Sequence, residues 1–150
     1  MPKIVHTDAK GLVQSTGSGA YLRSTKGVIK NQAAPVVLAD DAAAQSASDY
    51  AAGLCTITPT AARSQATDTA ANIISTLSLT ADDDSFDLHI INLSTDGARS
   101  LTLTAGANVT LLGSPIVHDR DDAADAVSSG SAHFRIRRAS ATTVTIARLA

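Results

Sequence analysis

The second half of the chain alternates between hydrophobic and polar residues with a period of two. Four segments show this pattern most clearly: residues 86–90, 100–104, 133–137 and 143–146. Successive side chains of a β-strand point to opposite faces, so this alternation is typical of strands with one face in a core and one in solvent. We therefore expect antiparallel strands with one buried face.

Residues that can turn the chain separate these segments. Asp96 and Gly97 supply the positive φ angles of a tight turn, so we expect a hairpin between the first two strands. Residues 105–108 and 138–142 are predicted to turn later corners. Only the acidic stretch 118–131 is long enough to leave the sheet.

Shorter elements are predicted upstream. Residues 35–39 and 54–58 have the composition of strands. Residues 40–53 are predicted to contain a capped helical turn closed by a glycine. A second short helix is expected over residues 69–77, capped by Thr67 or Asp68, because its hydrophobic residues recur at helical spacing. These hydrophobic residues are Ala70, Ile73, Ile74 and Leu77.

The first 34 residues differ from the rest. Short apolar pairs alternate with Gly, Ser and Thr, a composition that buries little surface by itself yet is too apolar for a free linker. We expect an extended arm that orders against another molecule. The predicted fold is mainly β, an antiparallel β-sandwich or barrel with one short helix, with the arm and connector in residues 1–50 and the β domain in residues 51–150.

Charge separates the same two regions. The lysines all lie in the first 30 residues, and residues 1–34 carry five cations against Asp8, a net charge of +4. The remainder has seven Arg against thirteen Asp, a net charge of −6, and no Glu. A basic arm can bind nucleic acid or an acidic protein surface. The cations form no dense cluster and have no interleaved aromatics, which favours a protein partner over nucleic acid or a solvated tail.

Few residues are candidates for chemistry. The histidines show no metal-binding spacing, and His89 and His133 fall on polar strand faces, where surface or inter-subunit hydrogen bonding is the favoured interpretation. Cys55, the single cysteine, lies in an apolar alternating run and is expected to be a buried, unreactive thiol.

Eight of the fourteen aspartates lie in two clusters, residues 82–87 and residues 119–125 around Arg120. Neither has the spaced ligands of a calcium loop, so solvated turns are favoured over metal sites. No nucleophile elbow or phosphate-binding loop is present. A small hydrolase using an aspartate pair or an aspartate-bound metal is the least favoured alternative, and we expect no enzymatic activity and no cofactor. The N-terminus lacks the apolar core of a signal peptide and no run is long enough to span a bilayer, so no membrane partner is expected.

Several segments together resemble a known family. TDTAANIISTL, DDSFDLHIINLST, SLTLTAGANVTLLGS and SAHFRIRRASATTVTIARL look like the β domain of structural proteins of tailed-bacteriophage virions, especially capsid decoration (cement) proteins. The resemblance covers roughly residues 55–149. KGLVQSTGSGAYL also looks like the leading arm of such proteins.

The resemblance implies a non-enzymatic homotrimer on the outer surface of the virion capsid, where it contacts the major capsid protein and stabilises the shell. We expect the arm to supply the capsid contacts and polar strand residues to supply the subunit interface. The arm contacts are Lys3, Lys10, Leu12, Val13, Tyr21, Arg23, Lys26 and Lys30; the interface residues are His89, His133, Arg135 and Arg137. The alternative is a trimeric head-fibre or tail-fibre module that binds host surface glycan, against which the scarcity of aromatics weighs.

Overall fold

The computed structural model describes residues 4–7, 11–14, 33–120 and 130–150. The chain divides into two compact units, Met1–Asn31 and Gln32–Ala150. The first contains an antiparallel hairpin of β1 (Ile4–Thr7) and β2 (Gly11–Gln14), in which Val5 lies opposite Val13. The glycine-rich pattern did not predict this hairpin, because its strands are short and β2 begins with a glycine.

The second unit, called the body below, begins earlier than the predicted boundary at residue 51. It includes a strand and a helix from the expected connector, β3 (Val36–Val37) and α1 (Ala47–Tyr50). The other elements are β4 (Leu54–Ile57), β5 (Arg63–Ala66), α2 (Ala70–Thr76), β6 (Ser85–Asn92), β7 (Leu101–Thr104), β8 (Val109–Leu112), β9 (Ile116–Val117), β10 (Ser131–Arg138) and β11 (Val144–Arg148).

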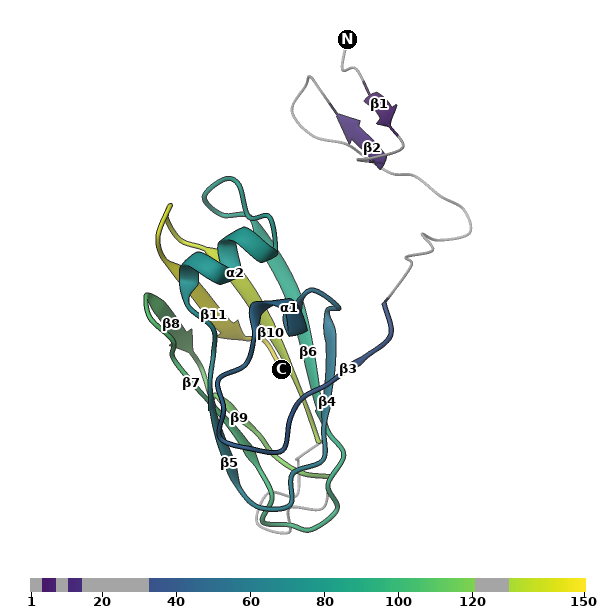
Figure 1. Cartoon of the computed structure of the whole chain (residues 1–150), viewed down its shortest axis with the longest axis vertical. Helices are drawn as coiled ribbons and strands as arrows, with labels where there is room; N and C mark the ends of the chain where they lie inside the picture. Colours follow the sequence, from purple (N-terminus) through teal and green to yellow (C-terminus); the bar gives the residue numbers. More distant parts are fainter. Residues whose placement is uncertain (1–3, 8–10, 15–32, 121–129) are drawn as a thin grey trace. The chain divides into compact units, whose positions relative to one another are not determined.

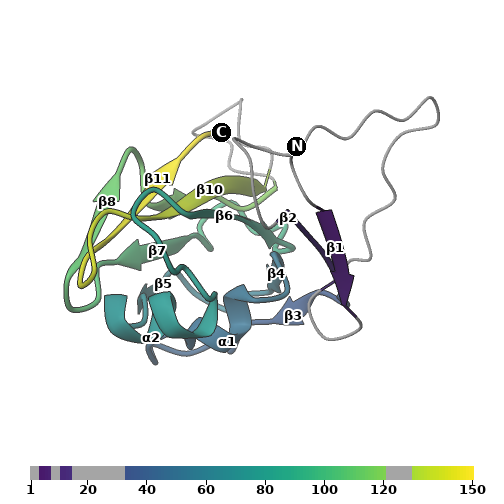
Figure 2. The same cartoon turned by 90° about the horizontal axis from the view of Figure 1, so that it is seen from above.

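The predicted mainly β fold is confirmed, with nine body strands in two sheets. One sheet has six strands in the order β3-β4-β6-β10-β11-β8, and the other has three in the order β5-β7-β9. Figure 1 shows both helices in front of the larger sheet, and Figure 2 shows them on the same side of it as the smaller sheet. The body is therefore a two-layer sandwich with one face of the larger sheet left uncovered by these elements.

The pairing of the strands is mixed, which corrects the expected antiparallel arrangement. β10 pairs antiparallel with β6 and β11, and β7 with β9. The pairs β3–β4, β4–β6, β8–β11 and β5–β7 are parallel. Alternation along one strand reports which face is buried but carries no information about the direction of its neighbour.

The predicted hairpin at Asp96 and Gly97 is wrong. β6 belongs to the larger sheet, whereas β7 belongs to the smaller one, so the chain changes layer between them. Asp96 and Gly97 lie in an exposed bend in which Asp96 pairs with Arg99. The predicted turn at 138–142 is confirmed, because it joins β10 to its antiparallel neighbour β11.

The core is built from aliphatic side chains of both sheets and both helices. Ile90 of β6, Ile136 of β10, Leu101 of β7 and Ile73 of α2 are all 0% exposed. Cys55 on β4 is also 0% exposed, and burial raises the pKa of its thiol to about 11. The predicted burial of Cys55 is confirmed, and a raised pKa disfavours the thiolate, which is the reactive form.

The two helices begin at polar caps. Ser46 caps α1 in a capping box with Asp49. At the start of α2, the Thr69 hydroxyl accepts from the backbone N–H of Asn72 at 3.3 Å. The predicted cap at Thr67 or Asp68 is therefore displaced by one or two residues. Both side chains bind distant segments, because the Thr67 hydroxyl accepts from the Gly106 N–H and Asp68 accepts from the Ala47 N–H. Asp68 also accepts from the Thr69 N–H and the Asn72 side chain at the start of α2.

Gly106 is required where the turn after β7 meets the segment before α2. A Cβ at this position would lie less than 3.0 Å from the backbone carbonyl oxygens of Thr67 and Asp68. We expect Gly106→Ala to lower the free energy of unfolding by about 1–3 kcal/mol, because backbone must move to admit the methyl group. Urea unfolding measures this loss. Ala105→Ser, at the exposed neighbouring position, should change stability by less than about 0.5 kcal/mol, and equal losses in both variants would contradict the steric explanation.

Candidate functional site

The uncovered face of the six-stranded sheet carries a cluster of polar side chains on its two central strands. On β6 and β10, Leu88, Ile90, Phe134 and Ile136 face the core, so the alternate residues point the other way. We define the outer face by these alternate residues: Asp87, His89, His133, Arg135 and Arg137. The four residues predicted as a subunit interface therefore lie together on one surface, and Asp87 joins them.

Two imidazoles stack at the centre of the outer face. His89 and His133 are directly opposite in the antiparallel register, with ring centroids 4.1 Å apart and planes inclined by 12°. The Nε2 atom of His133 has no accessible surface and no hydrogen-bond partner among the described residues, and it lies 3.7 Å from Asp87 Oδ2. The rings therefore form a flat, closely packed patch on this face.

Next to the histidines, Asp87 on β6 and Arg135 on β10 form a bidentate ion pair. The Arg135 Nε donates to Asp87 Oδ1 at 2.8 Å, and its terminal nitrogen donates to Oδ2 at 3.1 Å. The guanidinium of Arg135 holds the pKa of Asp87 below its usual value, with His133 and His89 contributing smaller electrostatic effects. The charges of Asp87 and Arg135 therefore neutralise each other, and the two hydrogen bonds hold both side chains in fixed positions.

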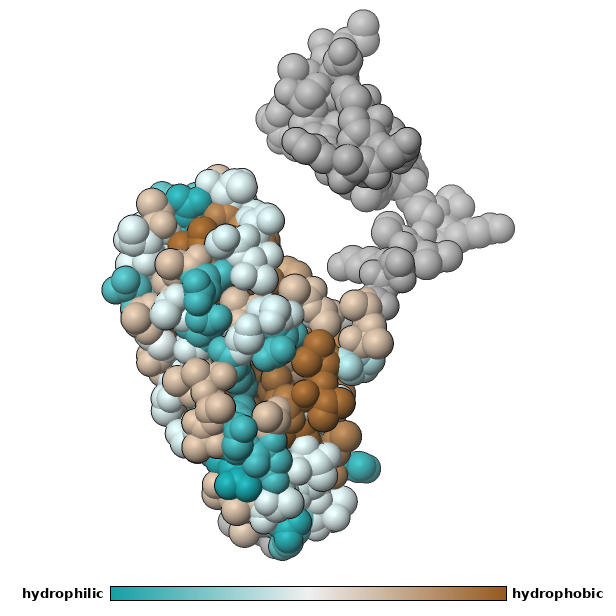
Figure 3. Space-filling view, in the orientation of Figure 1, coloured by the Kyte–Doolittle hydropathy of each residue, from teal (hydrophilic) through white to brown (hydrophobic). Residues whose placement is uncertain are grey.

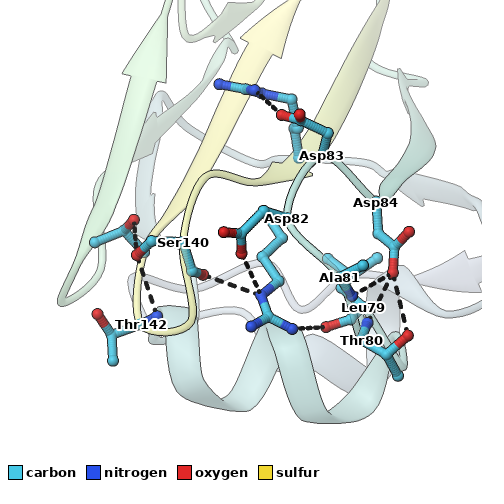
Figure 4. Close-up of polar contacts among 11 residues, drawn as sticks. Leu79, Thr80, Ala81, Asp82, Asp83, Asp84, Ser140 and Thr142 are labelled. Atoms are coloured by element: carbon cyan, nitrogen blue, oxygen red, sulfur yellow. Dashed lines mark hydrogen bonds and ion pairs between the residues drawn. The ribbon is translucent and has the colours of Figure 1, made fainter.

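At one end of β10, arginines bind the loop that contains the first aspartate cluster (Figure 4). Arg137 pairs with Asp83. Arg138 donates to the carbonyl oxygens of Leu79 and Ser140 at 2.9 and 3.1 Å and lies 3.3 Å from Asp82. Arginine side chains therefore anchor this turn to the sheet, whereas the sequence predicted a solvated turn.

Asp84 closes the same turn. Its Oδ2 accepts from the backbone N–H groups of Thr80 and Ala81, both at 2.8 Å, and these bonds, led by that from Ala81, lower its pKa. Asp40 is held in a similar way, because the Arg63 side chain and the Thr60 hydroxyl both donate to it and its pKa is lowered.

These lowered pKa values predict acid-sensitive stability. Asp40, Asp84 and Asp87 favour their ionised forms in the folded state, so their contribution is complete above the unfolded value of about 3.9 and is lost as pH falls towards the lower folded values. We expect the urea midpoint to be level from pH 7 to about 5 and to fall below about pH 4. Asp84→Asn should flatten that fall. An unchanged midpoint at pH 3 would contradict the role assigned to these carboxylates.

Apolar side chains lie beside the polar cluster, towards the β3 edge of the sheet. By register, Val37 and Thr56 share the outer side with Leu54, and Val37 is 76% exposed. Figure 3, which views the opposite, helix-bearing side of this sheet, shows hydrophobic side chains gathered at the same β3–β4 edge. The uncovered sheet face therefore combines paired charges with an apolar border, a composition found in protein interfaces.

The predicted arm contacts are only partly described. Leu12 and Val13 lie in β2, opposite His6 and Val5. Lys3, Lys10, Tyr21, Arg23, Lys26 and Lys30 lie outside the described residues, as does most of the second aspartate cluster. Asp119, at the start of that cluster, is only 1% exposed and accepts from the Arg99 N–H at 3.0 Å.

Sequence reasoning missed the partners of the predicted interface residues. Asp83 and Asp87 were assigned to a solvated turn, yet each pairs with an arginine more than forty residues away. The alternation of Asp and His on β6 and of His and Arg on β10 contained this signal, because opposite charges at matching strand positions stabilise a pair.

Comparisons with protein-family models, with curated proteins and with solved structures found no match to this chain. Among residues 33–120 and 130–150, no group of three His, Cys, Asp or Glu side chains is placed to hold a metal ion. In the described part of the chain, no helix has the length and apolar character needed to cross a membrane.

Proposed function

We propose that this chain is a structural virion protein that binds the outer surface of a tailed-phage capsid as a homotrimer and stabilises the shell. The observation that carries the proposal is the outer face of the larger sheet. Asp87 and Arg135 already form an ion pair there, His89 and His133 stack, and Val37 is exposed beside them. The sequence resemblance to capsid decoration proteins supports the same conclusion. In this role the protein acts through its surfaces and not through catalysis.

The outer face suits a contact between subunits for an energetic reason. Burying a lone charge is costly, whereas Asp87 and Arg135 already satisfy each other and their pair can be covered with little loss of hydrogen bonding. The stacked His89 and His133 add a flat surface against which another chain can pack. In a ring of three, this face of each subunit meets a different surface of the next one.

The arm supplies the second contact in this proposal. Residues 1–34 carry a net charge of +4, whereas the rest of the chain is acidic. The arm is therefore suited to bind an acidic surface of the major capsid protein. Three arms on one trimer act together, because the second and third attach at a high effective concentration once the first is bound. Individually weak contacts can then hold the protein on the shell and link neighbouring capsid subunits.

Among the described residues, no particular feature supports the glycan-binding fibre alternative. Sugar-binding surfaces commonly present aromatic rings, but Tyr50 is 1% exposed, Phe134 is 2% exposed and Phe86 packs against the core. We therefore retain the capsid-binding proposal alone.

A charge reversal at Arg135 tests the proposed subunit interface. Arg135→Glu places two carboxylates opposite each other on the outer face, so we expect the trimer to dissociate into folded single chains. Arg99→Glu is the matched control, because Arg99 also belongs to an exposed ion pair but lies in the loop after β6. Light scattering with circular dichroism measures mass and folding together. If the Arg135→Glu variant is folded and still trimeric, the outer face is not part of the subunit interface.

A further inference from the structure

The edges of the two sheets differ in how well they are protected. An exposed edge strand offers free backbone N–H and C=O groups to any passing chain, and natural proteins usually block such edges. The edges here are β3 and β8 in the larger sheet and β5 and β9 in the smaller one. β3 and β9 are two residues long and follow Pro35 or Pro115, which lack an N–H.

β5 is protected by the segment that precedes α1. The Gln45 N–H donates to the Ala66 carbonyl at 2.8 Å, and the Gln65 side chain donates to the carbonyl oxygens of Ala39 and Asp41. Arg63, at the start of the strand, adds an ion pair with Asp40. Three of the four edges are therefore short, preceded by proline or covered by chain.

β8 has none of these protections. The Val144 N–H donates to the Asn108 carbonyl at 3.1 Å, and the parallel register places Val109 beside Val144 and Leu111 beside Ile146. In such a ladder alternate residues bond to the same neighbour, so Thr110 and Leu112 bond to β11 while Leu111 directs its N–H and C=O to the open side. No other described backbone group binds Leu111.

The side chains of β8 also leave the edge open. The strand contains no proline, and no residue from 101 to 117 carries a charge, although the body as a whole is acidic. Leu112 is 53% exposed and Thr110 is exposed on the same side. Figures 1 and 2 both show β8 at the margin of the sheet.

We propose that β8 pairs with β8 of a second copy, antiparallel and across a twofold axis centred on Leu111. The two Leu111 residues then exchange two backbone hydrogen bonds, and Thr110 of each copy lies opposite Leu112 of the other. A second copy fits this edge because the register centred on Leu111 is self-complementary, and because the segment 101–117, which carries no charge, lets two acidic bodies approach there without strong repulsion.

The pairing is separate from the threefold contact and does not rest on the proposed function. A twofold contact uses the same strand on both copies and cannot close a ring of three. Four residues form a contact well below the roughly 1,000 Å² of a stable interface, so the pairing is weak in dilute solution. It becomes significant where copies are held side by side at effective concentrations of about a millimolar.

Residue-resolved amide hydrogen exchange on the full chain tests this pairing at about 10 μM and about 1 mM. We expect the Leu111 amide to exchange at least about tenfold more slowly at the higher concentration, while the Thr110 amide, bonded to β11, is protected at both. Leu112→Lys should abolish the concentration effect by placing charge at the edge, and Leu112→Thr should retain it.

Three results would overturn the pairing. The first is exchange at Leu111 that does not depend on concentration. The second is equal slowing in the Leu112→Lys variant. The third is protection that appears only when phage shells are added, which would make the occupant a capsid strand and not a second copy.

Discussion

Ile90→Ala should lower the free energy of unfolding of the body by about 2–5 kcal/mol. Ile90 lies at the centre of the six-stranded sheet, 0% exposed, between Cys55 on β4 and Ala132 on β10. Both cross-strand neighbours are small, so they cannot fill the space that the shortened side chain leaves. Urea unfolding at pH 7 measures the loss, and an unchanged denaturant slope would show that the variant unfolds as the natural chain does.

The next residue on the same strand provides the control. Ile91 faces the other side of the sheet and is only partly buried, so Ile91→Ala should cost about 1 kcal/mol or less. A comparable loss in the two variants would mean that the core does not lie on the side assigned to it.

Removal of residues 1–31 should strongly reduce retention on phage shells while leaving the body folded. The body has its own hydrophobic core, so its free energy of unfolding should change by less than about 0.5 kcal/mol. Retention should fall by tenfold or more, on the order expected when a multivalent attachment loses its contacts. Co-sedimentation with mature shells of a tailed phage, followed by gel quantification, measures it.

A second variant separates the charge of the arm from its other contacts. Replacement of the five cations by Gln keeps the arm but removes its positive charge; these are Lys3, Lys10, Arg23, Lys26 and Lys30. We expect weaker retention that no longer depends on salt, because screening acts on the charges alone. Equal retention of the truncated and natural chains would exclude the arm as the capsid contact.

The sequence predicted those strands in which every second residue is strongly apolar. β6, β10 and β11 follow that rule, because one face packs in the core while polar residues occupy the other. β5 escaped prediction because its buried residue is Gln65, which is held by hydrogen bonds to Ala39 and Asp41. Its place in the sheet depends on distant backbone, which no local pattern records.

Partner choice is the part that local sequence could not supply. Asp96 and Gly97 correctly indicate a change of direction, but a bend serves equally for a hairpin or for a crossing between sheets. The core decides between them, since Leu101 and Leu103 are buried in the smaller sheet. The same limit applies to the outer face, where His89, His133, Arg135 and Arg137 were foreseen but their pairing with Asp87 and Asp83 was not.

A sheet can serve as a binding surface without any catalytic group. Its regular spacing holds the histidine stack and the Asp87–Arg135 pair in fixed positions. Binding a partner therefore costs little conformational entropy in these side chains. In this account the body provides a rigid, repeated surface and the basic arm provides the reach.

The most direct test of the account is the native mass of the purified full-length chain, measured by light scattering on a sizing column at low micromolar concentration. We expect a single species with the mass of three chains of 15.3 kDa each. A folded species with the mass of one chain would contradict the homotrimer and the role assigned to the outer face.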